Sequence, residues 1–145
     1  EKEYIKKILN YSRTLEDYQK NLEHKFDQMF KILADDAEKQ NFRPLRKAIK
    51  YIKENYDKQI TAETLAEVVN LSPVYFSHLF KKQTGKNMTD YITEYRMEIA
   101  KKMLFDTDKT IFEIAVAVGF QDQRYFSKRF KQIVGKTPSE YRKLK

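Results

Sequence analysis

The stretch TIFEIAVAVGFQDQRYFSKRFKQIVG, residues 110–135, carries the punctuation of two short helices joined by a tight turn. Thr110 and Glu113 have the spacing of a capping box, in which each side chain bonds the backbone N–H of the other residue. Gly119 marks the turn, Asp122 is suited to cap the second helix, and the closing glycine supplies the left-handed residue that often ends a helix. A helix, a tight turn and a second helix make up the helix-turn-helix unit.

The same pattern occurs a second time, 50 residues upstream. Tyr75-Phe76-Ser77 corresponds to Tyr125-Phe126-Ser127, and 8 of the 20 positions from Ser72 to Tyr91 are identical to their counterparts. Before Ser72 the offset falls to 49, because the turn at 119–122 has one more residue. A repeat of this strength indicates two copies of one supersecondary unit.

The low content of helix breakers extends the helical prediction to the rest of the chain, since only 3 Gly and 3 Pro occur in 145 residues. We therefore predict an all-α fold, with two helix-turn-helix subdomains joined by a linker helix and preceded by a long amphipathic helix. The predicted boundaries are 1–42 for the N-terminal linker or dimerisation helix, 43–145 for the following domain, 61–85 for the first helix-turn-helix, 88–105 for the linker helix, 110–135 for the second helix-turn-helix and 138–143 for the C-terminal helix. A further helix is predicted from Pro44 to about Tyr56.

The positive charge is unevenly distributed. Lys and Arg total 29 against 21 Asp and Glu, a net charge of +8. Residues 1–42 hold 8 basic and 9 acidic side chains (net −1), whereas residues 43–145 hold 21 and 12 (net +9). The basic character therefore belongs to the predicted helix-turn-helix domain and favours an anionic partner.

The composition also excludes several classes of function. The chain has no Cys, which rules out disulfide scaffolds, thiol nucleophiles, thiolate zinc sites and cysteine alkyl acceptors. No apolar run reaches the roughly 18–20 residues that span a bilayer. The two His lie 54 positions apart, and no metal-ligand spacing, nucleophile motif or glycine-rich phosphate loop is present. We expect no enzymatic activity, no cofactor, no metal and no membrane contact.

On a helical wheel, the second helix of each unit separates into two faces. The inward faces hold Phe76, Leu79 and Phe80 in the first copy, and Phe126, Phe130 and Ile133 in the second. The outward faces hold Val74, Ser77, His78 and Lys81 in the first copy, and Arg124, Ser127, Lys128 and Lys131 in the second. Neither outward face has a carboxylate, whereas exposed helices generally mix both signs of charge. Arg129 replaces Leu79 and is expected to cover apolar surface with its stem.

Two such helices fit duplex DNA. A recognition helix enters the major groove with its N-terminal residues toward the bases, and two helices on one side of a duplex lie roughly 34–36 Å apart. The predicted linker helix would be about 27 Å long at 1.5 Å per residue, which suits a rigid spacer. The alternative is a helical protein–protein interaction module that does not bind DNA.

The segment from about Arg43 to Lys145 resembles the C-terminal DNA-binding domain of the AraC/XylS family of bacterial transcription regulators. The resemblance is carried by Ile111–Ala115, Val118–Asp122, Tyr125-Phe126, Phe130-Lys131, Gly135, Thr137-Pro138 and Tyr141-Arg142, and by Arg96, Ala100 and Met103-Leu104 in the linker helix. It implies two recognition helices in successive major grooves, with double-stranded DNA and RNA polymerase as partners. It also implies a transcription regulator of the bacterial cytoplasm, such as an activator.

The resemblance also implies which residues contact DNA. The base-contacting positions are Val74, Tyr75, Ser77, His78, Gln123, Arg124, Ser127 and Lys128. Phosphate contacts are expected from Lys81, Lys86, Lys131 and Lys136. Arginine commonly binds guanine through two hydrogen bonds, so we expect Arg124 to read a base, a phosphate clamp being the alternative. Val74 either touches a thymine methyl group or only fills space, and His78 either meets a base edge or is solvated.

The first 42 residues carry a different pattern. Apolar residues with steps of four and three lie at Tyr4, Ile8, Tyr11, Leu15, Tyr18 and Leu22, and resume at Phe26, Met29, Phe30 and Leu33. This is heptad spacing, which predicts a coiled coil and a homodimer through residues 4–33; the alternative is a helix packed on its own domain. Such a helix resembles the linkers of AraC-type two-component response regulators, and could also follow a membrane-bound sensor. We expect the chain to be part of a longer protein.

Overall fold

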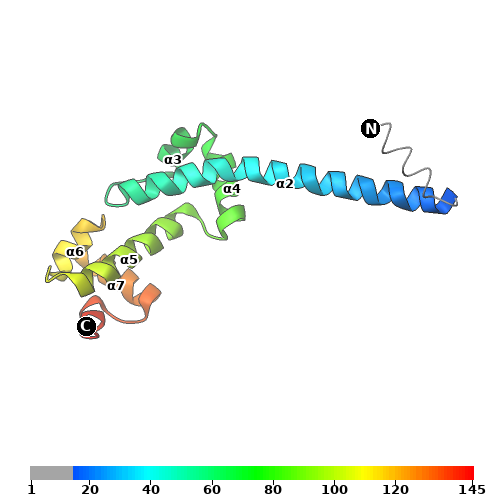
Figure 1. The fold of residues 1–145 in the computed structure, drawn as a ribbon. Coiled ribbons are helices and arrows are strands. Elements are labelled where there is room, and N and C mark those ends of the chain that lie inside the picture. The colour runs from blue at the N-terminus through cyan, green and yellow to red at the C-terminus, as the bar shows by residue number, and fades with distance from the viewer. Residues whose placement is uncertain (1–14) are drawn as a thin grey trace. The chain divides into compact units, whose positions relative to one another are not determined.

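The computed structural model describes the backbone of residues 15–145 and the side chains of residues 20, 23–29 and 42–145, and every regular element in these residues is a helix (Figure 1). The all-α prediction is confirmed. The elements are α2 (Leu15–Asn55), α3 (Ala62–Val69), α4 (Pro73–Thr84), α5 (Met88–Asp106), α6 (Ile111–Ala117), α7 (Gln123–Val134) and α8 (Pro138–Arg142). Contacts within the chain divide it into two units, Glu1–Phe42 and Arg43–Lys145.

The prediction of a separate helix beginning at Pro44 is wrong, because α2 includes Pro44 in its interior. Proline within a helix loses one backbone hydrogen bond and crowds the preceding turn. The residues that follow offset this cost, since Leu45, Ala48 and Ile52 are all buried within Arg43–Lys145. Tertiary burial of one helix face is the usual source of helix stability in proteins.

In residues 1–42, the structure describes the predicted apolar seam only in part. Tyr4, Ile8 and Tyr11 lie outside the described residues. Among the seam side chains that the structure does describe, Phe26 and Met29 are about half exposed, at 51% and 48%. The coiled coil remains a prediction.

The first helix-turn-helix consists of α3 and α4. Thr61 caps α3 by accepting a hydrogen bond from the backbone N–H of Thr64 at 3.1 Å, and Ser72 caps α4 through the N–H of Tyr75 at 3.2 Å. Between the helices, Asn70 adopts a left-handed conformation with φ of 55°. The inward face of α4 is buried as predicted, at Phe76, Leu79 and Phe80.

The second helix-turn-helix consists of α6 and α7. The capping box at Thr110 and Glu113 is confirmed, since each side chain bonds the other residue's backbone N–H. Asp122 caps α7 by accepting from the N–H of Tyr125 at 2.7 Å. The core of this unit contains Met97, Ala100, Leu104, Ile114, Ala115, Val118, Phe120, Phe126 and Phe130.

The predicted wheel of α7 is wrong at one position. Ile133 was predicted to face inward but is 37% exposed, and Val134 packs against the core in its place. Arg129 is half-buried: Nη1 donates to Gln132 at 3.0 Å, and Nη2 lies 3.9 Å from the Asp90 carboxylate of α5. Its guanidinium is thus partly paired within the protein.

The linker helix α5 buries two faces. Near its start, Met88 and Ile92 are buried, and Tyr91 meets Phe80 of α4 with ring centroids 5.3 Å apart. Farther along, Met97, Ala100 and Leu104 are fully buried in the core of the second helix-turn-helix. At 100° per residue, this second stripe lies roughly opposite Met88. Helix α5 therefore packs against both helix-turn-helix units.

Candidate nucleic-acid interface

Helix α4 presents one side of its first two turns to solvent. Val74 is 71% and Tyr75 51% exposed, and His78 is exposed one turn farther along, whereas Ser77 is half-buried. The Ser72 cap and Pro73 at the first helical position start the helix here, which places these side chains at its N-terminal end. This is the part of a recognition helix that can reach base edges.

Helix α7 presents the equivalent positions with different chemistry. Gln123, Arg124 and Lys128 are exposed and Tyr125 is 57% exposed, whereas Ser127, like its counterpart in α4, is half-buried. The Tyr125 ring lies 5.9 Å from that of Phe120, which holds it beside the turn. Five donor-bearing side chains therefore line the start of α7.

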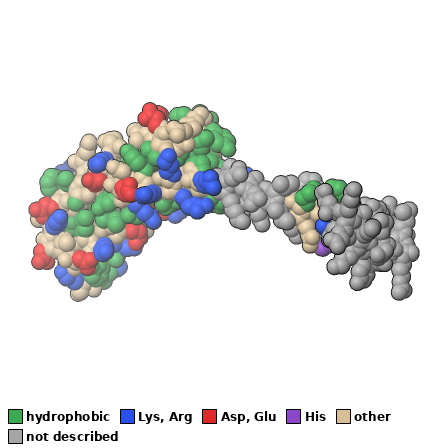
Figure 2. Space-filling model, turned by 45° about the horizontal axis from the view of Figure 1, so that its top comes forward, with side chains coloured by type: hydrophobic (Ala, Val, Ile, Leu, Met, Phe, Trp, Pro, Cys, Tyr) green, Lys and Arg blue, Asp and Glu red, His purple; other side chains and the backbone are tan. Residues whose placement is uncertain are grey.

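The exposed surfaces of the two helices contain no carboxylate, because neither Pro73–Thr84 nor Gln123–Val134 includes Asp or Glu. By contrast, acidic and basic side chains are interspersed on the face of Arg43–Lys145 that Figure 2 shows. An acid-free surface of this kind attracts anions.

The predicted phosphate-contacting lysines fall into two groups. Lys81, Lys131 and Lys136 are exposed, the first two at equivalent places on α4 and α7. Lys86 is also exposed, but its ammonium forms an ion pair with Glu94 of α5. A phosphate contact by Lys86 would have to compete with this carboxylate.

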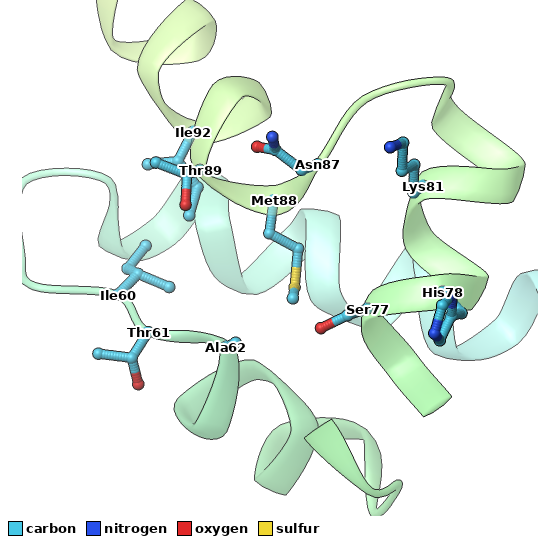
Figure 3. A pocket seen from close by; sticks show the side chains of 10 residues that line it. All are labelled: Ile60, Thr61, Ala62, Ser77, His78, Lys81, Asn87, Met88, Thr89 and Ile92. Carbon is cyan, nitrogen blue, oxygen red and sulfur yellow. The ribbon is translucent and has the colours of Figure 1, made fainter. Parts of the chain in front are cut away.

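Two adjoining hollows connect the neighbourhoods of the two helices. The first is lined by Ser77, His78 and Lys81 of α4, together with residues before α3 and at the start of α5 (Figure 3). The second is lined by the turn before α7 and by Tyr125. Both include Ile60, Thr89 and Ile92, so the hollows meet over the first turns of α5. The structure thus brings together predicted site residues from both units around one depression.

Several residues of this depression were not among the site residues predicted from the sequence. Gln59, Thr93 and Gln121 add neutral amide and hydroxyl groups to its lining. They come from three separate segments and follow no shared periodicity, so only the tertiary structure assembles them.

Neither a metal site nor a membrane span is found in the part of the chain that the structure describes. No group of three or more His, Asp or Glu there is arranged to hold a metal ion. No described helix is both long enough and apolar enough to cross a membrane.

Comparison with known proteins agrees with this arrangement. A family described as "Helix-turn-helix domain" matches residues 65–144. The chain is 32% identical over 127 residues to the bifunctional transcriptional activator/DNA repair enzyme AdaA of Bacillus subtilis, covering 77% of this chain and 60% of AdaA. The C-terminal domain of AraT, a response regulator from Geobacillus stearothermophilus, is 38% identical with a TM-score of 0.68, over 71% of this chain and 86% of that one. The DNA-binding domain of AdpA in complex with a target DNA is 26% identical with a TM-score of 0.67, over 70% and 91%.

Proposed function

The chain belongs to the AraC/XylS family of helix-turn-helix proteins, and we propose that residues 43–145 bind double-stranded DNA sequence-specifically as part of a bacterial transcription regulator. The observation that carries the proposal is the pair of acid-free helices, α4 and α7, that border one depression. The similarity to the AdpA domain, which was solved with its target DNA, supports the same partner. The chain spans 60% of the length of AdaA, so the activity of the whole protein is part of this proposal.

In the proposed complex, α4 and α7 enter successive major grooves of one duplex. Val74, Tyr75, Ser77 and His78 would contact bases in one groove, and Gln123, Arg124, Ser127 and Lys128 in the next. Lys81, Lys86, Lys131 and Lys136 would contact the phosphates between them. Arg124 is proposed to bind guanine through its two parallel donors, the most frequent specific contact in such complexes.

We also propose that the chain has no catalytic activity of its own. AdaA is named as both a transcriptional activator and a DNA repair enzyme, so family membership alone does not decide whether this chain is catalytic. The 145 residues contain no Cys and therefore no thiol that could accept an alkyl group. The proposed role is recognition, with RNA polymerase as a second partner and the bacterial cytoplasm as the site of action.

For the N-terminal unit, we propose a dimerising linker like those of response regulators. The similarity to the C-terminal domain of AraT supports a link to response regulators, because AraT is one. Dimerisation is supported by Phe26 and Met29, exposed apolar side chains that a second copy could cover. Analytical ultracentrifugation of residues 1–145 should show concentration-dependent dimers. A monomer at high micromolar concentration would argue against a self-sufficient coiled coil.

The experiment that tests DNA binding is selection from a random duplex pool, followed by a salt titration on the enriched site. We expect two half-sites with centres about 10–10.5 base pairs apart. If about six to ten phosphates are neutralised, the affinity should fall about 10³–10⁵-fold between about 50 and 200 mM salt. A protein-interaction module without DNA binding would enrich no sequence.

A matched pair of charge reversals sharpens this test. Lys128→Glu places a carboxylate on the acid-free face of α7, whereas Lys143→Glu makes the same change at an exposed residue after α8. Only Lys128→Glu should abolish enrichment. Equal effects of the two changes would mean that net charge alone, and not the recognition surface, drives binding.

A further inference from the structure

Arg96 of α5 holds the chain segment that follows α2. Its Nε donates to the backbone carbonyl of Tyr56 at 2.7 Å, and its Nη2 donates to that of Lys58 at 2.8 Å. Both carbonyls lie just beyond Asn55, where α2 ends. Burial of the guanidinium lowers its pKa, which the nearby Asp57 partly opposes, but a guanidinium remains charged in a protein. These are therefore charge-assisted hydrogen bonds, roughly twice as strong as neutral ones.

The same guanidinium contacts the turn of the second helix-turn-helix. Its central carbon lies 5.6 Å from the centre of the Phe120 ring, within the range of a cation–π interaction. A Cβ added at Gly119 would lie 3.0 Å from Cζ and Nη2 of Arg96 and 2.8 Å from the Tyr56 carbonyl. The turn, the end of α2 and the linker helix therefore meet at one point, which we call the Arg96 clamp: Tyr56, Lys58, Arg96, Gly119 and Phe120.

In the first helix-turn-helix, which the structure describes throughout, no arginine holds the equivalent turn in this way. Asn70 stands in the place of Gly119 and adopts a similar positive φ, 55° against 95°, with a side chain that is exposed. In the second unit, the backbone conformation and the close approach of Arg96 both favour glycine. The clamp is thus specific to the junction between the two helix-turn-helix units.

The clamp joins elements that belong to different units. Tyr56 and Phe120 both pack in the core of the second helix-turn-helix. Arg96 lies on α5, whose Tyr91 contacts Phe80 of the first helix-turn-helix. We propose that Arg96 is a positioning residue that fixes α7 relative to α4, and so determines the spacing of the two half-sites that the protein accepts. This inference rests on the DNA binding proposed above.

The physical basis is the effective concentration of the second recognition helix. A rigid connection delivers α7 to its groove as soon as α4 is bound, and linked modules gain about 10²–10⁴-fold in affinity when the geometry matches. A loosened connection loses part of this gain and tolerates other spacings. Contacts of each helix with its own half-site are unaffected.

The experiment uses the 145-residue chain and labelled duplexes that carry the selected site, each half-site alone, and versions with one base pair inserted or removed between half-sites. For Arg96→Gln, we expect half-site affinity to stay within about twofold, full-site affinity to fall about 10–100-fold, and the spacing optimum to broaden. Gly119→Ala disturbs the same clamp from the opposite side and should also broaden the optimum. Retention of a sharp spacing optimum in both variants would overturn the proposal.

Arg142 provides a matched control. Its Nε donates to the carbonyl of Leu104 at 3.5 Å and its Nη2 to that of Lys109, so it holds the end of α5 as Arg96 holds the end of α2. Both of its partners lie in α5 or in the segment before α6, and not in the segment that leads into the first helix-turn-helix. Arg142→Gln should lower the Tm and leave the spacing optimum sharp. Equal broadening in Arg142→Gln would reduce Arg96 to a general stabiliser and refute the positioning role. A wild-type chain that binds neither half-sites nor full sites would instead refute DNA binding itself.

Discussion

The two helix-turn-helix units share one architecture but present different chemistry to a ligand. Equivalent phenylalanines, Phe76 and Phe126, are completely buried in both. On the exposed side, Val74 stands where the second unit has Arg124, and His78 where it has Lys128. Helix α4 carries two cations, Lys81 and Lys82, whereas α7 carries four: Arg124, Lys128, Arg129 and Lys131.

The difference shows that packing and recognition vary independently in this molecule. Side chains that face inward must fill the same space in both copies, which keeps their volume and polarity alike. Side chains that face outward are free to change without affecting the fold. We infer that α4 reads its half-site mainly through neutral contacts, while α7 binds its half-site with more charge.

The largest expected effect concerns the shared core. Phe76→Ala and Phe126→Ala should each lower the free energy of unfolding by about 3–5 kcal/mol, because each empties a fully buried site. Phe126 lies 5.3 Å from Phe120 and 5.8 Å from Phe130, while Phe76 has only the Phe80 ring, at 5.9 Å, among the ring pairs observed in the described residues. The extra ring pair should make Phe126→Ala more costly by about 0.5–1.5 kcal/mol.

Urea unfolding followed by circular dichroism measures both values. The matched control is Tyr125→Ala, next to Phe126 but 57% exposed, which should cost much less. If Phe76→Ala proved more damaging than Phe126→Ala, the extra ring pair of Phe126 would not add to the stability of the second core.

The next effect concerns the exposed pair Arg124 and Val74. Arg124→Ala should weaken DNA binding by about 1–3 kcal/mol and relax the preference at one base pair. Val74→Ala should cost less, about 0.8 kcal/mol for each CH₂ group withdrawn from a thymine methyl contact, and should leave the salt dependence unchanged. Binding to a panel of single-base variants of the selected site, at fixed salt, distinguishes the two.

Because both side chains are exposed, the Tm of each variant should match that of the wild type and serves as the folding control. An equal loss on every sequence for Arg124→Ala would assign this residue to a phosphate. A change in salt slope for Val74→Ala would contradict a purely apolar contact.

Which features could be predicted from the sequence depends on how local their cause is. The caps at Thr110, Ser72 and Asp122 involve residues three apart, so spacing alone reveals them. The burial of Phe126 follows from helical periodicity within one helix. The repeat then transfers each inference from one unit to the other.

Features that depend on distant parts of the chain were missed. Ile133 is exposed because the core lies nearer to Val134, and α5 buries a second stripe because another unit packs on its opposite side. The partners of Arg96 are backbone carbonyls 40 and 38 residues away. Every residue has such a carbonyl, so the sequence does not indicate which ones Arg96 binds. The lining of the depression likewise needs three segments to come together.

A smaller effect is expected from the equivalent lysines Lys81 and Lys131. Each lies on the exposed side of its helix, one turn beyond the proposed base contacts. If both contact phosphates, Lys81→Ala and Lys131→Ala should each reduce the slope of log affinity against log salt by about one, on every sequence alike. Filter-binding titrations across a salt series measure the slopes.

The matched control is Lys143→Ala, at an exposed lysine outside both helices, which should leave the slope unaltered. A reduction for Lys131→Ala without one for Lys81→Ala would mean that only the second unit is held electrostatically to the backbone. That result would sharpen the contrast between the two units.

The smallest expected effect concerns the N-terminal caps of α5 and α8, the helices that follow the first and second helix-turn-helix. At α8, Thr137 and Glu140 form a capping box: Oε2 of Glu140 accepts from the N–H of Thr137 at 3.0 Å, and Oγ1 of Thr137 accepts from that of Glu140 at 3.2 Å. At the start of α5, Asn87 accepts from the N–H of Asp90 at 2.8 Å, while the Asp90 carboxylate lies 3.9 Å from Arg129. Only the second unit therefore combines a reciprocal cap with a titrating carboxylate.

The hydrogen bond from the Thr137 backbone lowers the pKa of Glu140, and the cations of Lys131 and Lys136 lower it further. Because the folded pKa lies below the unfolded one, the cap contributes stability above the ordinary range of glutamate, about pH 4.3, and loses it as the pH falls through that range toward the folded pKa. Glu140→Gln keeps an acceptor oxygen but cannot titrate, so its Tm should fall less than that of the wild type between neutral and acidic pH. Parallel Tm profiles for the two proteins would show that the Glu140 carboxylate does not contribute to the acid sensitivity of the second unit.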